Sequence, residues 1–157
     1  MVNLVKITDY ITEDLIELNL MATNKTEALE VLSGLISKSP NIGDKKEAVH
    51  KALVEREKLG STGIGKGVAI PHAKTDEVKQ LTIAFGKSAN KIDFKSIDND
   101  GVNIFFVFAS PYKDSQIYLK VLARISRLIR EDEFRKELLA CKSPKDVIEC
   151  IEKREVS

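Results

Sequence analysis

The sequence predicts a single α/β domain built as a three-layer α/β/α sandwich. Short apolar segments typical of strands alternate along the chain with segments whose apolar residues recur at the period of a helix. The most apolar segment, residues 102–109, has the character of a central strand covered on both faces. The expected helices are numerous enough to cover both faces of a sheet. The length of 157 residues, with 43% hydrophobic and 31% charged side chains, suits one globular domain spanning 1–157.

Capping signals and apolar periodicity predict five helices. Asn24 and Asp44 each stand three residues before a glutamate, which is the spacing of a capping box that opens a helix. The first helix ends before Pro40, and Gly60 is placed to end the second. Three further helices are expected from about residue 114, over 132–140, and from Ser143, with Pro144 in the first turn.

Strands are predicted where short apolar runs are bounded by turn residues. Pro71 closes one of them, because proline has no N–H to donate to a strand ladder. Residues 98–101, Asp-Asn-Asp-Gly, form a strong turn signal before the central strand. The expected strands are one short segment within 9–20, then 68–70, 81–85, 90–94 and 102–109.

Composition argues against several classes of protein. The 25 basic and 24 acidic side chains nearly cancel, whereas nucleic-acid-binding proteins usually carry a basic excess. Residues 1–10 lack a signal-peptide core, and the longest apolar run, 104–109, is far too short to span a membrane. We therefore expect a cytoplasmic protein with no direct membrane insertion. Cys141 and Cys150 form no C-x-x-C pattern and are expected to be reduced thiols on helix faces; no metal or other cofactor is expected.

Residues 60–67 look like a nucleotide-binding P-loop but fail its requirements. Gly60 to Lys66 reads G-x-x-x-x-G-K, yet Gly67 stands where the loop needs a hydroxyl for magnesium. The stretch also follows a helix and enters a strand, the reverse of the P-loop order, so we exclude nucleotide hydrolysis. Two interpretations of the glycines stay open. They form a tight turn, or, with the hydroxyl groups of Ser61 and Thr62, a nest of N–H groups that binds a phosphate.

His72 is the strongest candidate for a catalytic residue. It follows Pro71 at the carboxyl end of a short buried strand, the edge where α/β sheets place ligands. An imidazole near its ordinary pKa is substantially neutral at cytosolic pH and can act as a nucleophile toward phosphorus. Arg56 offers a guanidinium that suits a phosphate. The other histidine, His50, is expected to be a partly exposed residue of the second helix.

The residues around His72 resemble a known phosphorylation-site motif, that of the fructose/mannitol-type IIA domains of the bacterial phosphoenolpyruvate-dependent sugar phosphotransferase system. The resemblance continues through the apolar strand ending near residue 111 and the helix from residue 114, so it covers most of the chain. The residues that carry it are Arg56-Glu57, Gly60-Ser61-Thr62-Gly63, Ile64-Gly65 and Val68-Ala69-Ile70-Pro71-His72-Ala73.

The resemblance implies an α/β/α fold with a mixed sheet and an enzymatic role as a phosphotransferase component. His72 would accept a phosphoryl group through Nε2 from the histidine phosphocarrier protein. It would pass that group to a IIB domain, which serves a membrane IIC subunit. Arg56 would stabilise the phosphate, and Ser61 and Thr62 would line the active site as loop donors. The exchange between two imidazoles would be nearly balanced and would require no metal.

Tyr118 is the one clear departure from the family pattern. The family usually has a second histidine before a leucine at the start of the helix that follows the central strand, and here that position reads Ile117-Tyr118-Leu119. A phenol can donate a hydrogen bond to a phosphate while remaining neutral. Alternatively, Tyr118 begins the buried stripe that its helix continues.

Three functions remain open on the sequence. The first is a transport phosphocarrier for a fructose-, mannitol- or galactitol-like sugar. The second is a nitrogen-related IIA regulator whose phosphorylation state controls protein partners, and the third is a binding module that is no longer phosphorylated. Partners would dock on a shallow apolar patch around His72, with Ile64, Val68 and Ala73 as candidate members.

Overall fold

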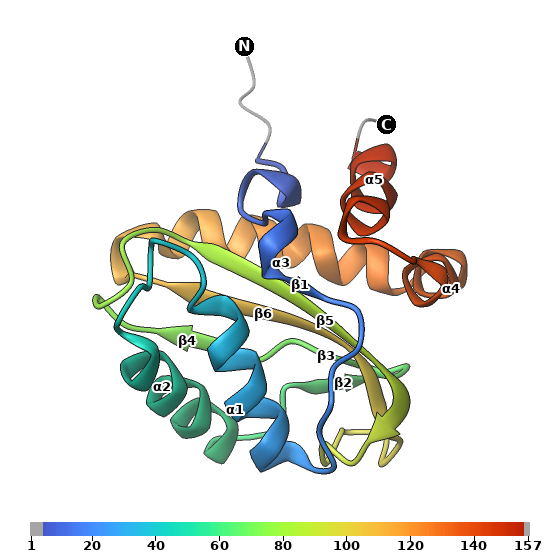
Figure 1. Ribbon diagram of the computed structural model, residues 1–157, viewed down its shortest axis with the longest axis horizontal. Helices are drawn as coiled ribbons and strands as arrows, with labels where there is room; N and C mark the ends of the chain where they lie inside the picture. The colour runs from blue at the N-terminus through green and yellow to red at the C-terminus, as the bar shows by residue number, and fades with distance from the viewer. Residues whose placement is uncertain (1–4, 156–157) are drawn as a thin grey trace.

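The computed structural model describes residues 5–155, which form a mixed six-stranded sheet between two layers of helices (Figure 1). The ends of the expected domain, residues 1–4 and 156–157, lie outside the described part. One face of the sheet is covered by α1 (Lys25–Ile36) and α2 (Lys46–Lys58). The other is covered by α3 (Ser115–Ile129), α4 (Asp132–Ala140) and α5 (Pro144–Glu155). The predicted three-layer α/β/α class is confirmed.

The sheet is mixed, with two long antiparallel strands at its centre. The strand order is β1-β5-β6-β3-β2, and β4 also pairs with β6. Strand β5 runs antiparallel to β6, whereas β3 and β4 run parallel to it, and β1 runs parallel to β5. The strands are β1 (Ile16–Glu17), β2 (Gly63–Gly65), β3 (Val68–Ala69), β4 (His72–Lys74), β5 (Thr82–Ile92) and β6 (Val102–Ser110). Three short 3-10 helices span Ile7–Asp9, Glu13–Leu15 and Tyr112–Asp114.

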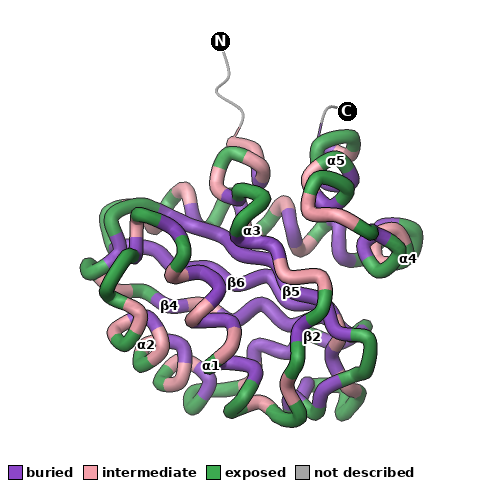
Figure 2. Tube along the Cα trace, in the orientation of Figure 1, coloured by how far each residue is buried: buried purple, intermediate pink, exposed green. Residues whose placement is uncertain are grey.

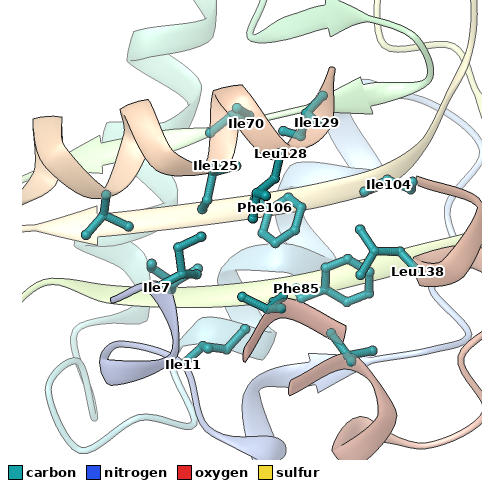
Figure 3. Packing of buried hydrophobic residues seen from close by; sticks show 14 of the residues in the cluster. Ile7, Ile11, Ile70, Phe85, Ile104, Phe106, Ile125, Leu128, Ile129 and Leu138 are labelled. Carbon is teal, nitrogen blue, oxygen red and sulfur yellow. The ribbon is translucent and has the colours of Figure 1, made fainter. Parts of the chain in front are cut away.

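Strand β6 divides the hydrophobic core into two halves. Ile104, Phe106 and Phe108 belong to the cluster under α3–α5. The alternate residues Phe105, Val107 and Ala109 belong to the cluster under α1 and α2, as the side-chain period of a strand requires. Figure 2 shows β6 largely buried, and Figure 3 shows Phe106 beside Leu128 of α3 and Phe85 beside Leu138 of α4. The prediction of a central strand covered on both faces is confirmed.

The predicted helices are all present, but their starts differ in detail. The Asn24 side chain accepts a hydrogen bond from the Glu27 N–H at 2.9 Å, which confirms the first cap. The cap predicted at Asp44 is wrong, because Asp44 lies in a turn and α2 begins after Lys45 without a side-chain cap. Gly60, with φ of +152°, follows the end of α2 and donates its N–H to the Glu57 carbonyl, as expected of a helix-ending glycine.

Two strand predictions need correction. Residues 90–94 are not a separate strand, because β5 continues through Gly86 to Ile92 with a shift in register against β6. The hairpin strand β2 and the three-residue β4 are absent from the prediction. Both are short and are held by pairing with β3 and β6, so local alternation could not reveal them. Within residues 5–155, none of the helices combines the length and hydrophobicity that a membrane crossing requires.

Candidate active site

His72 follows Pro71 as predicted, but it begins a further short strand, β4, which the sequence did not indicate. Its Cα partner is Phe108 on β6, whose N–H donates to the Pro71 carbonyl at 2.9 Å. Strand β3 ends at Ala69, two residues before Pro71, and the Pro71 carbonyl keeps the chain attached to β6. Strand alternation buries Ala73 and leaves the flanking His72 half-buried and Lys74 exposed.

Hydrogen bonds to both ring nitrogens determine the tautomer of His72. Arg56 Nε lies 3.0 Å from His72 Nε2, and the Ile70 carbonyl oxygen lies 3.2 Å from Nδ1. An arginine can only donate, so Nε2 must carry the lone pair; a carbonyl can only accept, so Nδ1 must carry the proton. The ring is thus held with the nucleophilic lone pair on Nε2.

The surroundings of His72 favour its neutral form. Burial lowers the pKa of His72 from its ordinary value near 6.5, and the positive charges of Arg56 and Lys74 lower it further. The Ile70 carbonyl and the Glu57 carboxylate raise the pKa of His72, but they do not reverse the shift. The imidazole is consequently uncharged near neutral pH, as a nucleophile must be.

Arg56 is held in place by Gly60 and donates a hydrogen bond to His72 Nε2. It lies in the last turn of α2, and its Nη1 donates to the Gly60 carbonyl at 2.8 Å, which fixes the direction of the guanidinium. Its Nε–H occupies the lone pair with which His72 would attack. If His72 accepts a phosphoryl group at Nε2, as the sequence predicts, that group would displace the N–H, which could then donate to a phosphoryl oxygen instead.

The hydroxyl groups of Ser61 and Thr62 have partners other than His72. Thr62 is buried, and its Oγ1 donates to the Glu57 carboxylate. Ser61 Oγ donates to the Phe94 carbonyl at 3.2 Å and accepts from the Gly63 N–H at 3.0 Å. The fold thus brings Arg56 to His72 while the two hydroxyls stabilise the loop, and their donation to a phosphate stays a prediction.

The glycines of this stretch are explained by a hairpin turn. Gly65, Lys66 and Gly67 all have positive φ, at 95°, 58° and 78°, in the turn that joins β2 to β3. The N–H groups of Thr62, Gly63 and Lys66 donate to side chains of Glu57, Ser61 and Asp98. These amides are already engaged, so the structure favours the turn over a preformed phosphate nest.

Tyr118 is both a core residue and a neighbour of His72. Its ring packs edge-on against Phe108 at 5.4 Å between centroids and lies 5.7 Å from the His72 ring. Burial raises the pKa of Tyr118, so the phenol stays neutral.

Lys74 is a residue near the site that the sequence prediction missed. Its Nζ lies 5.4 Å from the centre of the Tyr118 ring and 5.9 Å from the centre of the Tyr112 ring. Its place two residues after His72 on a strand was the available signal.

The apolar surface beside the site differs from the predicted patch. Val68 and Ala73 are buried, so only Ile64 of the three expected members is exposed. Sequence reasoning missed Leu59, Tyr112 and Leu119, which are 84%, 60% and 60% exposed. Leu59 directly precedes Gly60, whose carbonyl accepts the Arg56 hydrogen bond. The Tyr112 ring lies near the same Lys74 ammonium as the Tyr118 ring. Leu119 follows Tyr118 on α3.

The remaining candidate groups lie apart from these contacts. His50 on α2 is partly exposed, as predicted, and its Nε2 lies 3.3 Å from a Glu30 carboxylate oxygen. Cys141 and Cys150 are free and buried; Cys150 lies on α5, whereas Cys141 follows the end of α4. Among residues 5–155, no cluster of three or more histidine, cysteine or acidic side chains is arranged to hold a metal ion.

Fold and site together define an α/β domain with a neutral imidazole positioned as a nucleophile beside an arginine. Residues 9–154 match the family model described as "Phosphoenolpyruvate-dependent sugar phosphotransferase system, EIIA 2". The chain belongs to this family and is a phosphocarrier component of the phosphotransferase system.

Similar proteins come from two branches of the family. The chain is 35% identical over 146 residues to the "PTS system fructose-specific EIIABC component" of Bacillus subtilis (strain 168), covering 93% of this chain but only 23% of that protein. It is 36% identical over 134 residues to the "Nitrogen regulatory protein" of Bradyrhizobium diazoefficiens, covering 85% of this chain and 86% of that protein. The crystal structure of nitrogen regulatory protein IIA-Ntr from Neisseria meningitidis superposes with a TM-score of 0.86 at 28% identity, covering 92% of this chain and 98% of the other.

Proposed function

We propose that His72 is the phosphorylated residue and that it carries the phosphoryl group between two protein partners in the cytoplasm. The donor is the histidine phosphocarrier protein, and the acceptor is a IIB domain that serves a membrane IIC subunit. The observation that carries this proposal is the pair of hydrogen bonds on His72, at 3.0 Å to Arg56 Nε and 3.2 Å to the Ile70 carbonyl. Together they hold a neutral imidazole with its lone pair on Nε2.

The transfer is an exchange of one phosphorus–nitrogen bond for another. The His72 Nε2 lone pair attacks phosphorus as the bond to the donor imidazole breaks and its electron pair returns to the donor ring. His72 keeps its Nδ1 proton, and the Ile70 carbonyl stabilises the positive charge that the ring gains. Arg56, released from the lone pair, stabilises the phosphoryl oxygens. In transfer to the IIB domain, a nucleophile of that domain attacks the phosphorus, the bond from phosphorus to His72 Nε2 breaks, and its electron pair returns to Nε2 as the lone pair of the neutral ring.

The sugar branch is our first candidate for the pathway that this phosphocarrier serves. The Bacillus subtilis relative is named for fructose and joins EIIA to B and C components in one protein. We propose fructose, mannitol or a galactitol-like sugar as the substrate class of the partner permease. The second candidate is regulation in the nitrogen-related branch, because a relative of that branch matches at similar identity, 36% against 35%, and over 86% of its own length.

Phosphorylation with purified components tests the site. The protein is incubated with phosphoenolpyruvate, the first enzyme of the system and the histidine phosphocarrier protein, and intact mass is measured before and after acid treatment. We expect one acid-labile phosphate on the parent and on His50→Ala, and none on His72→Ala. Equal phosphate on His72→Ala would refute the site, and an unphosphorylated parent would leave only the role of a binding module.

Transfer to a panel of purified IIB domains tests the branch. Rapid transfer to one sugar-specific IIB domain would establish transport and the sugar class together. Absence of transfer to every IIB domain, with partner proteins captured by only one phosphorylation state, would support the regulatory alternative.

A further inference from the structure

A buried ion pair lies behind the loop that precedes the phosphorylation site. Lys25, the first residue of α1, places Nζ 2.7 Å from Glu57 Oε2 on α2. The Glu57 side chain is 5% exposed and that of Lys25 is 21% exposed. The Lys25 ammonium also lies 4.8 Å from the centre of the Phe94 ring, which covers it on another side.

The Glu57 carboxylate also binds the loop. The Thr62 N–H lies 3.1 Å and 3.3 Å from its two oxygens, and the Thr62 hydroxyl donates to the same group. A buried carboxylate is stable only while hydrogen-bond donors surround it. Moving residue 62 would therefore expose the Glu57 carboxylate to solvent or leave it buried without enough donors. The ion pair therefore anchors the loop of residues 60–62 to both helices of this layer.

Two short paths of hydrogen bonds connect the anchored loop to the two ring nitrogens of His72. On one path, the Thr62 carbonyl accepts from the Ile70 N–H at 2.9 Å, and the Ile70 carbonyl accepts from His72 Nδ1. On the other, the Gly60 carbonyl accepts from Arg56 Nη1 at 2.8 Å, and Arg56 Nε donates to His72 Nε2. Both groups that set the tautomer of His72 thus depend on where residues 60–62 lie.

We propose that Lys25 and Glu57 are positioning residues for phosphoryl transfer. Their ion pair fixes the loop of residues 60–62, and the loop places the Ile70 carbonyl and the Arg56 guanidinium on the two nitrogens of His72. Neither residue touches the phosphoryl group. The inference deepens the proposed function and rests on it for the transfer step alone, because the tautomer of His72 can be measured without any phosphorylation.

The decisive variant is Lys25→Met, which keeps the length of the side chain and removes its charge. In ¹⁵N NMR spectra of the unphosphorylated parent we expect a protonated Nδ1 and an unprotonated Nε2 on His72. Lys25→Met should give a mixture of both tautomers, and kcat for phosphoryl acceptance should fall by about 10-fold to 100-fold at unchanged KM. Lys25→Arg should restore both readouts, because it keeps the donor.

The chain contains a matched control between the same two helices. Lys46 on α2 and Glu30 on α1 form an ion pair of 3.2 Å whose side chains are both exposed. Lys46→Met should therefore leave the tautomer and kcat at parental values. Thr62→Val keeps the ion pair but removes the hydroxyl donor, and it should shift the tautomer in the same direction with a loss of about fivefold in kcat.

Two results would overturn the inference. One is a folded Lys25→Met protein with the parental tautomer and kcat, even if its melting temperature is lower, since that would make the pair purely structural. If Lys25→Met does not fold, a parental tautomer in Thr62→Val has the same consequence. Failure of the parent to accept phosphate would refute the proposed function, while the tautomer measurement would still decide this inference.

Discussion

At the scale of single residues, the site depends on a competition for one lone pair. Arg56 donates to His72 Nε2 in the unphosphorylated protein, so the group that would stabilise the phosphate also protects the nucleophile. The cost of displacing this hydrogen bond is small, because the guanidinium keeps its bond to the Gly60 carbonyl and regains a stronger, charge-assisted partner in the phosphoryl group. Under the proposed function, the same hydrogen bond would hold His72 in the tautomer that attacks phosphorus until the phosphoryl donor arrives.

The lowered pKa of His72 predicts how phosphoryl acceptance depends on pH. Burial is the main cause, and the Arg56 charge adds to it. Only the neutral ring accepts, so activity should be constant above the ordinary pKa of about 6.5 and should be lost as pH falls through the lower pKa of the folded protein. An NMR titration of His72, assigned with His72→Gln, gives this midpoint. Arg56→Met should move it upward, and a parental midpoint at or above 6.5 would contradict the prediction.

At the scale of elements, a buried lysine joins β5 to the end of α4. Lys87 Nζ donates to the carbonyls of Leu138, Leu139 and Cys141, at 3.3, 2.8 and 2.5 Å. These carbonyls lie at the carboxyl end of α4, where the last carbonyls of a helix have no N–H of the next helical turn to accept from. The helix dipole also favours a positive charge at this end. Lys87 therefore connects the sheet to the helical layer at the end far from the tip of α3 that carries Tyr118.

Lys87→Met should destabilise the protein without changing the site. The substitution removes three hydrogen bonds, and although the Leu138 carbonyl keeps the Cys141 N–H as a donor, the buried Cys141 carbonyl loses its lysine partner. The free energy of unfolding should fall by about 2–4 kcal/mol. Urea unfolding followed by circular dichroism measures the change. Lys91→Met, on the same strand but in an exposed pair with Asp100, is the control and should change the free energy by less than about 0.5 kcal/mol. Equal free energies of unfolding for the two variants would show that the hydrogen bonds from Lys87 to the end of α4 do not stabilise the protein.

The sequence revealed elements whose signals are local and missed those that depend on distant pairing. The apolar stripe of α3 and the continuous apolar run of β6 are properties of uninterrupted segments, so both elements were predicted closely. The strand β4 has three residues and begins after a proline; it is a strand only because β6 lies beside it. The extension of β5 past Gly86 has the same origin, since residues 87–91 are polar apart from Ala89 and carry no apolar alternation.

At the scale of the whole molecule, the site combines residues that the chain keeps far apart. His72 and Arg56 could be predicted because one short motif contains both. Lys25 could not, because it precedes His72 by 47 residues and its only local feature is its place at the start of a helix, where a positive charge is unfavourable. The packing of α1 against α2 brings it to Glu57, so its role follows from the tertiary structure alone.

The surface around the site predicts how a partner docks. Leu59, Tyr112 and Leu119 are exposed apolar side chains. Each is a sequence neighbour of a site residue or contacts one, so we expect a protein that delivers a phosphoryl group to His72 to cover them. Leu119→Glu should raise KM for the histidine phosphocarrier protein about tenfold at unchanged kcat, because it places a charge in the apolar contact without touching His72. Leu139→Glu is the matched control, since Leu139 is also exposed but lies on α4, beyond the opposite end of α3. Initial rates of phosphorylation at varied donor concentration measure both constants, and an equal KM for the two variants would place the docking surface elsewhere.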